Sequence, residues 1–183
     1  MNLLTGLLIA FLAAIVVAGT SISWTWLIGT GWEPAPNPVV VKMLTLAEVR
    51  EGDVVYDLGS GDGRVLVKAV RDFGAKAVGI EADPIRWFLT WLNIRRAKIG
   101  AAKVIWGNFF KVNLSGASVV VIFLSRGTNR RLRNKFLREL SPGTRIVSYF
   151  WPIDGWESQQ IDPESKIYIY RVPDSGGSDS LNK

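Results

Sequence analysis

The first 32 residues form an apolar block without a charged side chain, since Glu33 is the first charged residue. From Leu3 to about Trp24 the sequence is almost wholly apolar, about the 20 residues that a membrane-spanning helix needs. Trp24, Trp26 and Trp32 stand where an aromatic belt at the lipid–water boundary is expected. A cleaved secretory signal would have a basic start and a shorter apolar core. The pattern therefore predicts that residues 1–32 are a retained membrane anchor with one transmembrane helix.

Beyond this block, helical and strand patterns alternate along the chain. Residues 33–38 are rich in proline and predict an extended linker, in which Asn37 is the N-cap and Pro38 the first residue of a helix that ends near Ala47. Further helices are expected at about 64–73, 84–98 and 129–140. Strands are expected at 54–58, 77–81, 103–106, 118–124 and 144–150, before a closing antiparallel pair at 156–161 and 166–172. The tail at 174–183 is rich in Ser, Gly and Asp and is predicted to be disordered.

Strands that alternate with helices predict a parallel α/β sheet with helices on both faces, formed by a single domain at residues 39–173. In such sheets the ligand binds beyond the carboxyl ends of the strands. Four candidate residues stand at or just past the ends of the predicted strands: Asp57, Glu81, Asn108 and Leu124. The pattern therefore predicts that these residues belong to one site.

The segment Asp-Leu-Gly-Ser-Gly-Asp-Gly at residues 57–63 joins the first strand to the next helix. The segment has glycines at alternate positions, Gly59, Gly61 and Gly63, with Ser60 between the first two. Glycine allows positive φ angles and lets the backbone approach a ligand closely. Glu81 ends the next strand, where an acid suits the two hydroxyls of a ribose. A turn that merely needs glycine is the plainer interpretation, but the two flanking acids favour a nucleoside cofactor.

The charges around this loop separate the candidate cofactors. A phosphate-binding Walker loop needs a lysine after its last glycine, and no lysine lies between Gly59 and Lys68. The dinucleotide fingerprint has its third glycine one residue later, and Asp57 would repel a pyrophosphate. A carboxylate there would instead attract the cationic amine of a methionine moiety. The loop therefore favours S-adenosyl-L-methionine over a nicotinamide cofactor.

Asn108 and Phe109 follow the third predicted strand and are candidates for contact with the adenine of such a cofactor. The Asn108 amide can pair with the base edge, and Phe109 can pack on the ring. The alternatives are an asparagine that caps the next turn and a phenylalanine in the core.

Composition limits the chemistry further, because the chain has no cysteine and no histidine. Disulfides, zinc sites with Cys or His ligands, thiol nucleophiles and imidazole bases are excluded, and we expect no metal. The net charge of +6 is compatible with acidic partners such as anionic lipid or nucleic acid. Basic residues crowd the helix near residues 126–138, where a solvated face is the favoured interpretation and lipid contact the alternative. Trp87 and Trp91 share a helix face, for which core packing is favoured over contact with a membrane interface.

The loop at residues 57–63 resembles the signature of seven-strand, class I methyltransferases, which have a Rossmann-like sheet. More narrowly, the chain is similar to small archaeal protein-lysine methyltransferases and to the mitochondrial enzymes that modify the ATP synthase c subunit and the adenine nucleotide translocase. The resemblance covers about residues 36–172. Its motifs are Pro-Asn-Pro at 36, Val-Val-Tyr-Asp-Leu-Gly-Ser-Gly-Asp-Gly-Arg at 54, Ala-Val-Gly-Ile-Glu at 77, Gly-Asn-Phe-Phe at 107, Val-Ile-Phe-Leu at 121, Leu-Ser-Pro-Gly-Thr-Arg-Ile-Val-Ser at 140 and Gly-Trp at 155.

This resemblance implies methyl transfer from S-adenosyl-L-methionine to lysine amines of protein substrates, including membrane-associated ones, with nucleic acid not expected as a partner. A neutral amine is already a good nucleophile, so alignment and exclusion of water suffice without a strong base. We expect Phe123, Leu124 and Ser125 to form the floor of the lysine channel, where other methyltransferases carry Asn-Pro-Pro-Tyr. Tyr149 and Trp151 are candidate walls, with core or surface packing equally compatible.

Some features depart from the family pattern or leave other functions open. The linker lacks the aromatic and small hydroxyl residues that the family leads us to expect, and residues 148–152 are unusually aromatic. An RNA or small-molecule methyltransferase and a non-catalytic cofactor-binding module remain alternatives. We expect the catalytic domain on the cytoplasmic side of the membrane, because S-adenosyl-L-methionine is found there.

Overall fold

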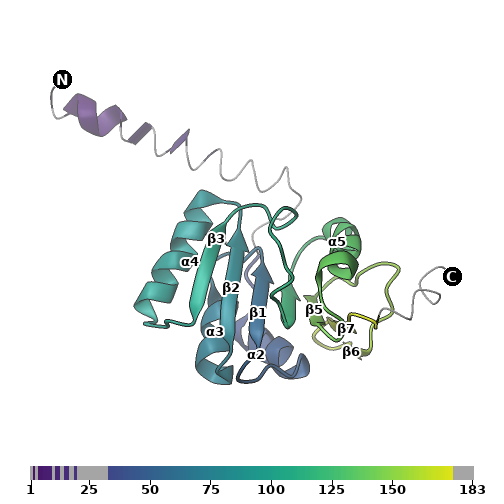
Figure 1. Ribbon diagram of the computed structural model, residues 1–183. Coiled ribbons are helices and arrows are strands. Elements are labelled where there is room, and N and C mark those ends of the chain that lie inside the picture. Colours follow the sequence, from purple (N-terminus) through teal and green to yellow (C-terminus); the bar gives the residue numbers. More distant parts are fainter. Residues whose placement is uncertain are drawn as a thin grey trace.

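The computed structural model describes residues 2, 4–9, 11–12, 15–16, 19 and 33–174. Seven strands form one sheet in the order β3-β2-β1-β4-β5-β7-β6 (Figure 1). The strands are β1 (Val54–Leu58), β2 (Lys76–Glu81), β3 (Ala102–Trp106), β4 (Val119–Ile122), β5 (Arg145–Tyr149), β6 (Gln160–Asp162) and β7 (Ile167–Arg171). The helices of the domain are α2 (Asn37–Leu46), α3 (Arg64–Phe73), α4 (Pro84–Arg96) and α5 (Arg126–Glu139).

The strand pairing confirms the predicted sheet, because β1 pairs in parallel with both β2 and β4. β3 and β5 extend the parallel part on either side, and β7 and β6 add an antiparallel pair at one edge. The chain crosses from one side of the sheet to the other between β3 and β4. The carboxyl ends of β1, β2 and β4 therefore meet at the switch point where ligands bind in open α/β sheets.

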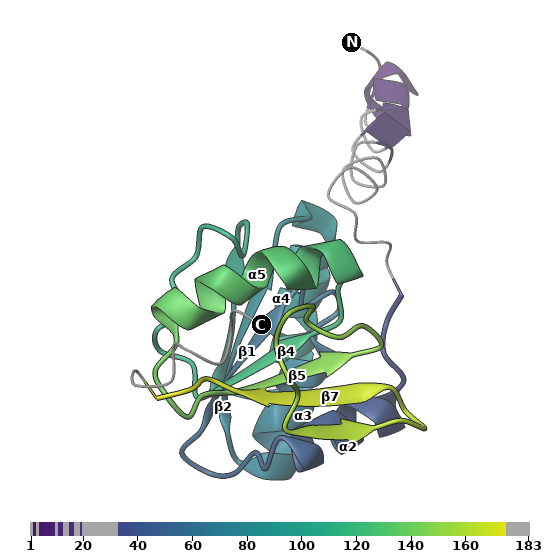
Figure 2. The same ribbon diagram turned by 90° about the vertical axis from the view of Figure 1, so that its right-hand side faces the viewer.

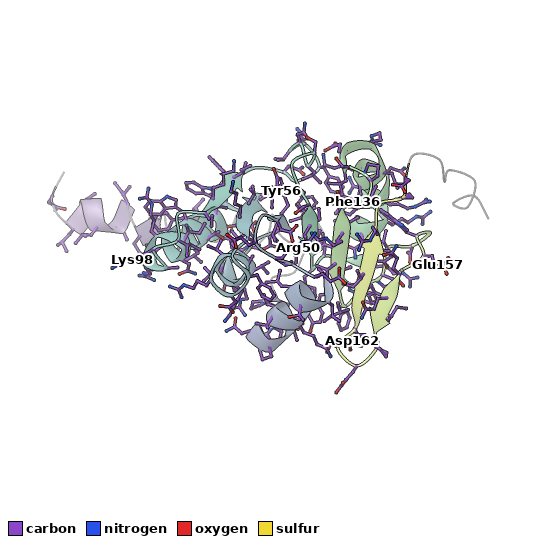
Figure 3. All side chains as sticks on the ribbon, turned by 60° about the horizontal axis from the view of Figure 1, so that its bottom comes forward. Arg50, Tyr56, Lys98, Phe136, Glu157 and Asp162 are labelled. Atoms are coloured by element: carbon purple, nitrogen blue, oxygen red, sulfur yellow. The ribbon has the colours of Figure 1, made fainter. Side chains whose placement is uncertain are left out.

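Successive side chains of a strand point to opposite faces of the sheet, so the central strands contribute residues to two hydrophobic cores, one on each face. Val55, Val119 and Val121 face a core closed by α2, α3 and α4. Leu58 and Val120 face a second core, which α5 and the connection between β3 and β4 cover. Figure 2 shows α5 on the opposite side of the sheet from α2 and α3. In Figure 3, Phe136 of α5 lies against the sheet, where it is fully buried.

Capping explains where two helices begin. Asp83 caps the start of α4, because its carboxylate accepts hydrogen bonds from the N–H groups of Ile85 and Arg86, both at 2.9 Å. α5 begins at Arg126, three residues earlier than predicted. Ser125 starts it, because its Oγ accepts a hydrogen bond from the Thr128 N–H at 3.3 Å.

The prediction for the start of α2 was wrong. Asn37 is the first helical residue and not the cap, so the helix begins inside the predicted linker and before the predicted domain boundary at residue 39. Pro36 takes the cap position, and the cap has no side-chain hydrogen bond. Pro38 still falls within the first turn, where its missing N–H is tolerated.

The closing hairpin is shorter than predicted, since residues 156–159 precede β6. Trp156 instead packs on Tyr170 of β7, with ring centroids 5.7 Å apart. Lys42 of α2 forms an ion pair with Asp162, which ties the first helix of the domain to this hairpin. The hairpin is therefore fixed to the same side of the molecule as α2.

Much of the predicted anchor at 1–32 and nearly all of the predicted tail at 174–183 lie outside the described residues. The described residues between 4 and 19 are helical. No helix in the described part of the chain has the length and apolarity required to cross a membrane.

Candidate functional site

A cleft opens at the carboxyl ends of β1, β2 and β4. It brings together eight of the residues predicted from the sequence, from four separate segments of the chain: Asp57, Gly59, Ser60, Gly61, Glu81, Phe109, Phe123 and Leu124. Three predicted residues do not line it: Gly63, Asn108 and Ser125. The structure thus places most of the predicted site residues in one cleft, whereas Asn108, one of the four expected at the strand ends, lies outside its lining.

The glycine loop is held against the end of β2 by backbone hydrogen bonds. The N–H groups of Gly59 and Ser60 both donate to the Ile80 carbonyl, at 2.8 and 3.2 Å. Gly59 and Gly61 have positive φ angles of 85° and 58°, a conformation that side chains other than glycine adopt at a cost. The loop therefore presents bare backbone to the cleft in a fixed conformation.

Gly63 has a different role from the other two glycines. A Cβ at this position would lie 2.8 Å from Cγ2 of Thr90, so glycine is needed for packing against α4. Thr90 also donates a hydrogen bond to the Gly61 carbonyl at 2.8 Å. Gly79 is a further requirement that the sequence did not reveal, because a Cβ there would lie 2.8 Å from Cβ of Ser60. Both glycines hold the loop in place and make no contact with the cleft.

The Glu81 carboxylate is buried and joins the loop to the start of α4. One oxygen accepts a hydrogen bond from the Gly61 N–H at 2.9 Å, and the other accepts one from the Asp83 N–H at 3.0 Å. A carboxylate oxygen can accept more than one hydrogen bond. Glu81 can therefore order the loop and still receive two hydroxyl groups from the cleft.

Asp57 carries the most perturbed carboxyl group of the site. Burial raises its pKa to about 8, and repulsion from Glu81 and Asp62 acts in the same direction. The Asp57 side chain is 5% exposed, and no cation among the described residues offsets these effects. A cationic ligand group placed here would stabilise the ionised carboxylate.

Arg64 is a residue of the cleft whose role the sequence did not reveal. Its guanidinium forms an ion pair with Asp62 at 2.6 Å and donates a hydrogen bond to the Ala35 carbonyl at 2.8 Å. Glu33, Pro34 and Ala35 also line the cleft. Arg64 thereby holds the segment that leads into the domain across one side of the site.

Replacing Arg64 by alanine should release this segment and weaken cofactor binding by about 1 kcal/mol, or roughly fivefold, because a charge-assisted hydrogen bond at a partly exposed site is lost. Arg64→Lys keeps the positive charge, but a lysine ammonium lacks the planar guanidinium that contacts Asp62 and the Ala35 carbonyl at the same time. We therefore expect an intermediate effect. Titration calorimetry with S-adenosylhomocysteine measures both. Equal affinities in the three proteins would show that the segment does not depend on Arg64.

The two residues after β3 differ in their placement. Phe109 belongs to the second hydrophobic core and also lines the cleft, so the structure is compatible with both roles considered for it. The Asn108 side chain caps the following turn, where its oxygen accepts a hydrogen bond from the Phe110 N–H at 2.9 Å. Asn108 lies outside the lining, so the alternative role as a turn cap fits the structure better than contact with adenine.

Phe123 and Leu124 line the cleft directly after β4, whereas Ser125 is occupied as the cap of α5. Tyr149 packs on Phe123, with ring centroids 4.5 Å apart, and thus supports the floor of the cleft from behind. Neither Tyr149 nor Trp151 lines the cleft. The predicted floor is therefore two apolar side chains without a hydroxyl group.

Comparison with known proteins identifies the family to which this geometry belongs. A family model described as the ANTKMT methyltransferase domain matches residues 57–160, which include most of the cleft. The chain belongs to this family. It is an S-adenosyl-L-methionine-dependent methyltransferase with the predicted seven-strand α/β fold.

Two relatives illustrate the range of this methyltransferase family. A protein-lysine N-methyltransferase of Saccharolobus islandicus (strain REY15A) is 43% identical over 147 residues, which cover 76% of this chain and 91% of the relative. The human lysine N-methyltransferase of the ATP synthase c subunit is 30% identical over 165 residues, which cover 88% of this chain and 70% of the relative.

A solved structure of similar fold contains the demethylated cofactor. It is an RNA methyltransferase from Salinibacter ruber in complex with S-adenosyl-L-homocysteine, with a TM-score of 0.76 and 38% identity. The match covers 78% of this chain and 95% of that one. Names within this group of similar proteins thus include both protein and RNA acceptors.

The residues of this methyltransferase fit its cofactor. The buried Asp57 carboxyl suits an amine, and Glu81 has acceptor capacity for ribose hydroxyls. A Cβ at Gly59 would lie 3.3 Å from the Leu124 side chain, so the glycine keeps the cleft open between loop and floor. When bound, S-adenosyl-L-methionine supplies a methyl group on a positively charged sulfur.

Proposed function

We propose that this methyltransferase transfers methyl groups to lysine side chains of proteins. The observation that carries the proposal is the floor of the cleft, where β4 ends in Phe123 and Leu124. Apolar side chains there can align an acceptor and exclude water, but they cannot remove a proton. The acceptor must therefore be a good nucleophile once neutral, as the lysine amine is.

In this proposal the described residues of the cleft bind the cofactor and orient it toward the acceptor. The glycine loop and Glu81 position the nucleoside, and Asp57 holds the amine of the methionine part. Phe123 and Leu124 exclude solvent from the transfer path. The lysine ammonium must lose its proton before transfer, and water at the cleft mouth can accept it. The names of the Saccharolobus and human relatives support the same acceptor class.

RNA is the second candidate acceptor, because the Salinibacter protein is described as an RNA methyltransferase and is 38% identical to this chain. An exocyclic base amine is a poor nucleophile and requires polar groups that hold it in plane. The cleft floor has no such side chain at Phe123 or Leu124. We therefore favour the lysine acceptor.

An acceptor assay separates the two candidates. The purified full chain is incubated with methyl-labelled S-adenosyl-L-methionine and with membrane protein, soluble protein or total RNA. Label in protein, located on lysine by mass spectrometry and absent from a Gly61→Val control, is the expected result. Label that enters only RNA would replace the lysine proposal by the RNA one.

We further propose that residues 1–32 anchor the enzyme in a membrane and that the catalytic domain faces the cytoplasm. The uncharged apolar block before Glu33 supports the anchor, and the cytoplasmic supply of cofactor supports the orientation. Alkaline extraction of membranes from cells that express the full chain should leave it in the pellet. Protease digestion of sealed membranes should remove the domain only from the cytoplasmic side. Release by alkali would reject the anchor.

A further inference from the structure

The outer face of α4 exposes a group of large apolar side chains. Ile85, Phe88, Leu89 and Trp91 lie on the side of the helix that turns away from the sheet, and Phe88 is 50% exposed. Phe88 and Trp91 stack on each other, with ring centroids 5.7 Å apart. This contradicts the expectation of core packing for Trp91, whereas Trp87 does pack inward and its indole reaches the Val104 carbonyl at 3.4 Å. A group of exposed apolar side chains on one helix face is typical of an interaction surface.

Trp106, at the end of the neighbouring edge strand β3, extends the same surface. Its indole N–H donates to the Ala82 carbonyl at 3.1 Å, yet the side chain is 64% exposed. The hydrogen bond and a contact with the Trp87 ring, whose centroid lies 6.3 Å away, fix the Trp106 ring in this exposed position. We refer to Ile85, Phe88, Leu89, Trp91 and Trp106 together as the α4 surface.

Positive charge accompanies the α4 surface. The Arg95 guanidinium lies 5.3 Å from the centre of the Trp91 ring, and Arg96 and Lys98 are exposed beside it. Residues 84–98 contain four Lys or Arg and no Asp or Glu, although the chain as a whole contains 22 basic and 16 acidic residues. A partner of this surface must therefore offer apolar contact and negative charge together.

The position of the α4 surface relates it to the N-terminal segment. Ala82 and Arg86 line the cleft, as does Glu33, which follows the uncharged block of 32 residues. The apolar block therefore joins the domain near the end of α4 that begins the surface. Figure 1 shows α4 beside β3 at one edge of the sheet, and in Figure 3 Lys98 lies at the opposite side of the molecule from Asp162.

We propose that the α4 surface docks on an anionic lipid bilayer. The aromatic rings and the aliphatic side chains of Ile85 and Leu89 enter the headgroup region, and Arg95, Arg96 and Lys98 contact lipid phosphates. Tryptophan prefers this boundary because its ring is apolar and its N–H is polar. Aliphatic side chains have no stacking role with nucleic acid, which favours lipid over RNA. Docking would turn the mouth of the cleft toward substrates at the membrane surface.

Because the chain contains no cysteine, one introduced thiol can carry a single environment-sensitive fluorophore. We choose Phe88→Cys on the α4 surface and, as a matched control, Glu164→Cys in the exposed turn between β6 and β7 at the opposite edge of the sheet. Each labelled full chain is reconstituted with vesicles of phosphatidylcholine alone or mixed with phosphatidylglycerol, with or without brominated acyl chains. We expect a blue shift and quenching by bromine at position 88 in the anionic vesicles and neither effect at position 164.

The double variant Arg95→Glu/Arg96→Glu, combined with Phe88→Cys, tests the charge contribution. It should lose most of the quenching while it retains its affinity for S-adenosylhomocysteine, because both arginines lie outside the cleft. Equal signals at positions 88 and 164 would overturn the proposal. So would a label at position 88 that is already shielded without lipid, which would indicate self-association or cover by the N-terminal segment, or one that RNA shields instead. Quenching that persists in the double variant would overturn the charge contribution, because the surface would then enter lipid without these arginines.

The docking proposal is independent of which group accepts the methyl. It also does not require residues 1–32 to span the membrane. A labelled surface that enters lipid while no lysine is methylated would reject the proposed function alone. A labelled surface that stays out of lipid, together with lysine methylation, would reject the docking alone.

Discussion

Glu81→Ala should weaken the binding of S-adenosylhomocysteine by about 3 kcal/mol, or roughly 150-fold, the loss expected for two hydrogen bonds from ribose hydroxyls to a carboxylate. The effect extends to the protein itself. Removing the carboxylate leaves the N–H groups of Gly61 and Asp83 without their acceptor. We therefore expect a lower unfolding temperature as well as weaker binding, measured by calorimetry on the same samples.

Two further variants separate these effects. Glu81→Gln keeps one acceptor oxygen but turns an amide NH₂ toward the second backbone N–H, so it should rescue little of the affinity. Glu33→Gln removes a carboxylate from another wall of the same cleft, at an exposed position, and should bind almost normally. A Glu81→Ala variant that binds with unchanged affinity would mean that the nucleoside does not reach this carboxylate.

Much of the fold could be predicted from the sequence because local patterns and tertiary packing agree. The apolar runs of β2 and β4 are buried on both faces, as expected for central parallel strands. Errors arose at element ends, where a single side chain decides the boundary. The hydroxyl of Ser125 starts α5 three residues before its predicted start at residue 129, and Pro36 takes the cap position expected for Asn37.

The residues of the candidate site likewise divide into those that the local sequence marks and those that only tertiary contacts reveal. Asp57, the glycine loop and Glu81 were predictable because chemistry and spacing mark them within short segments. Arg64 was not, because its role depends on the Ala35 carbonyl, 29 residues earlier, which only the folded chain brings within 2.8 Å. Gly79 looks like an ordinary strand residue until its distance to Ser60 is known. Long-range sterics therefore account for most of what the sequence did not reveal.

The affinity for S-adenosylhomocysteine should rise with pH up to about 8, because the Asp57 carboxyl must ionise to pair with the ligand amine. Its pKa in the unliganded protein is raised from 3.8 to about 8 by burial and by Glu81 and Asp62. At lower pH, binding must release a proton, which costs about 1.4 kcal/mol, or tenfold in Kd, for each pH unit. Calorimetry at several pH values, in buffers of different ionisation enthalpy, measures both the affinity and the protons released.

The same linkage predicts how the stability of the unliganded protein changes. In the unfolded chain Asp57 ionises near pH 3.8, whereas in the folded protein its raised pKa keeps it protonated to about pH 8. The unfolded state therefore loses a proton first, so this group reduces the unfolding free energy as pH rises between those values. The chain has no histidine, so no other side chain with an ordinary pKa titrates between pH 5 and 8.

Asp57→Asn is the decisive variant, because an amide keeps the shape of the side chain but cannot ionise. It should bind S-adenosylhomocysteine weakly at every pH, release no proton and show a nearly constant unfolding free energy from pH 5 to 8, the range in which the wild type loses stability. Bound ligand should restore the stability of the wild type at pH 8 and not that of the variant. A pH slope of Kd that survives in the variant would assign the proton to another group, and the amine would then need a different partner in the cleft.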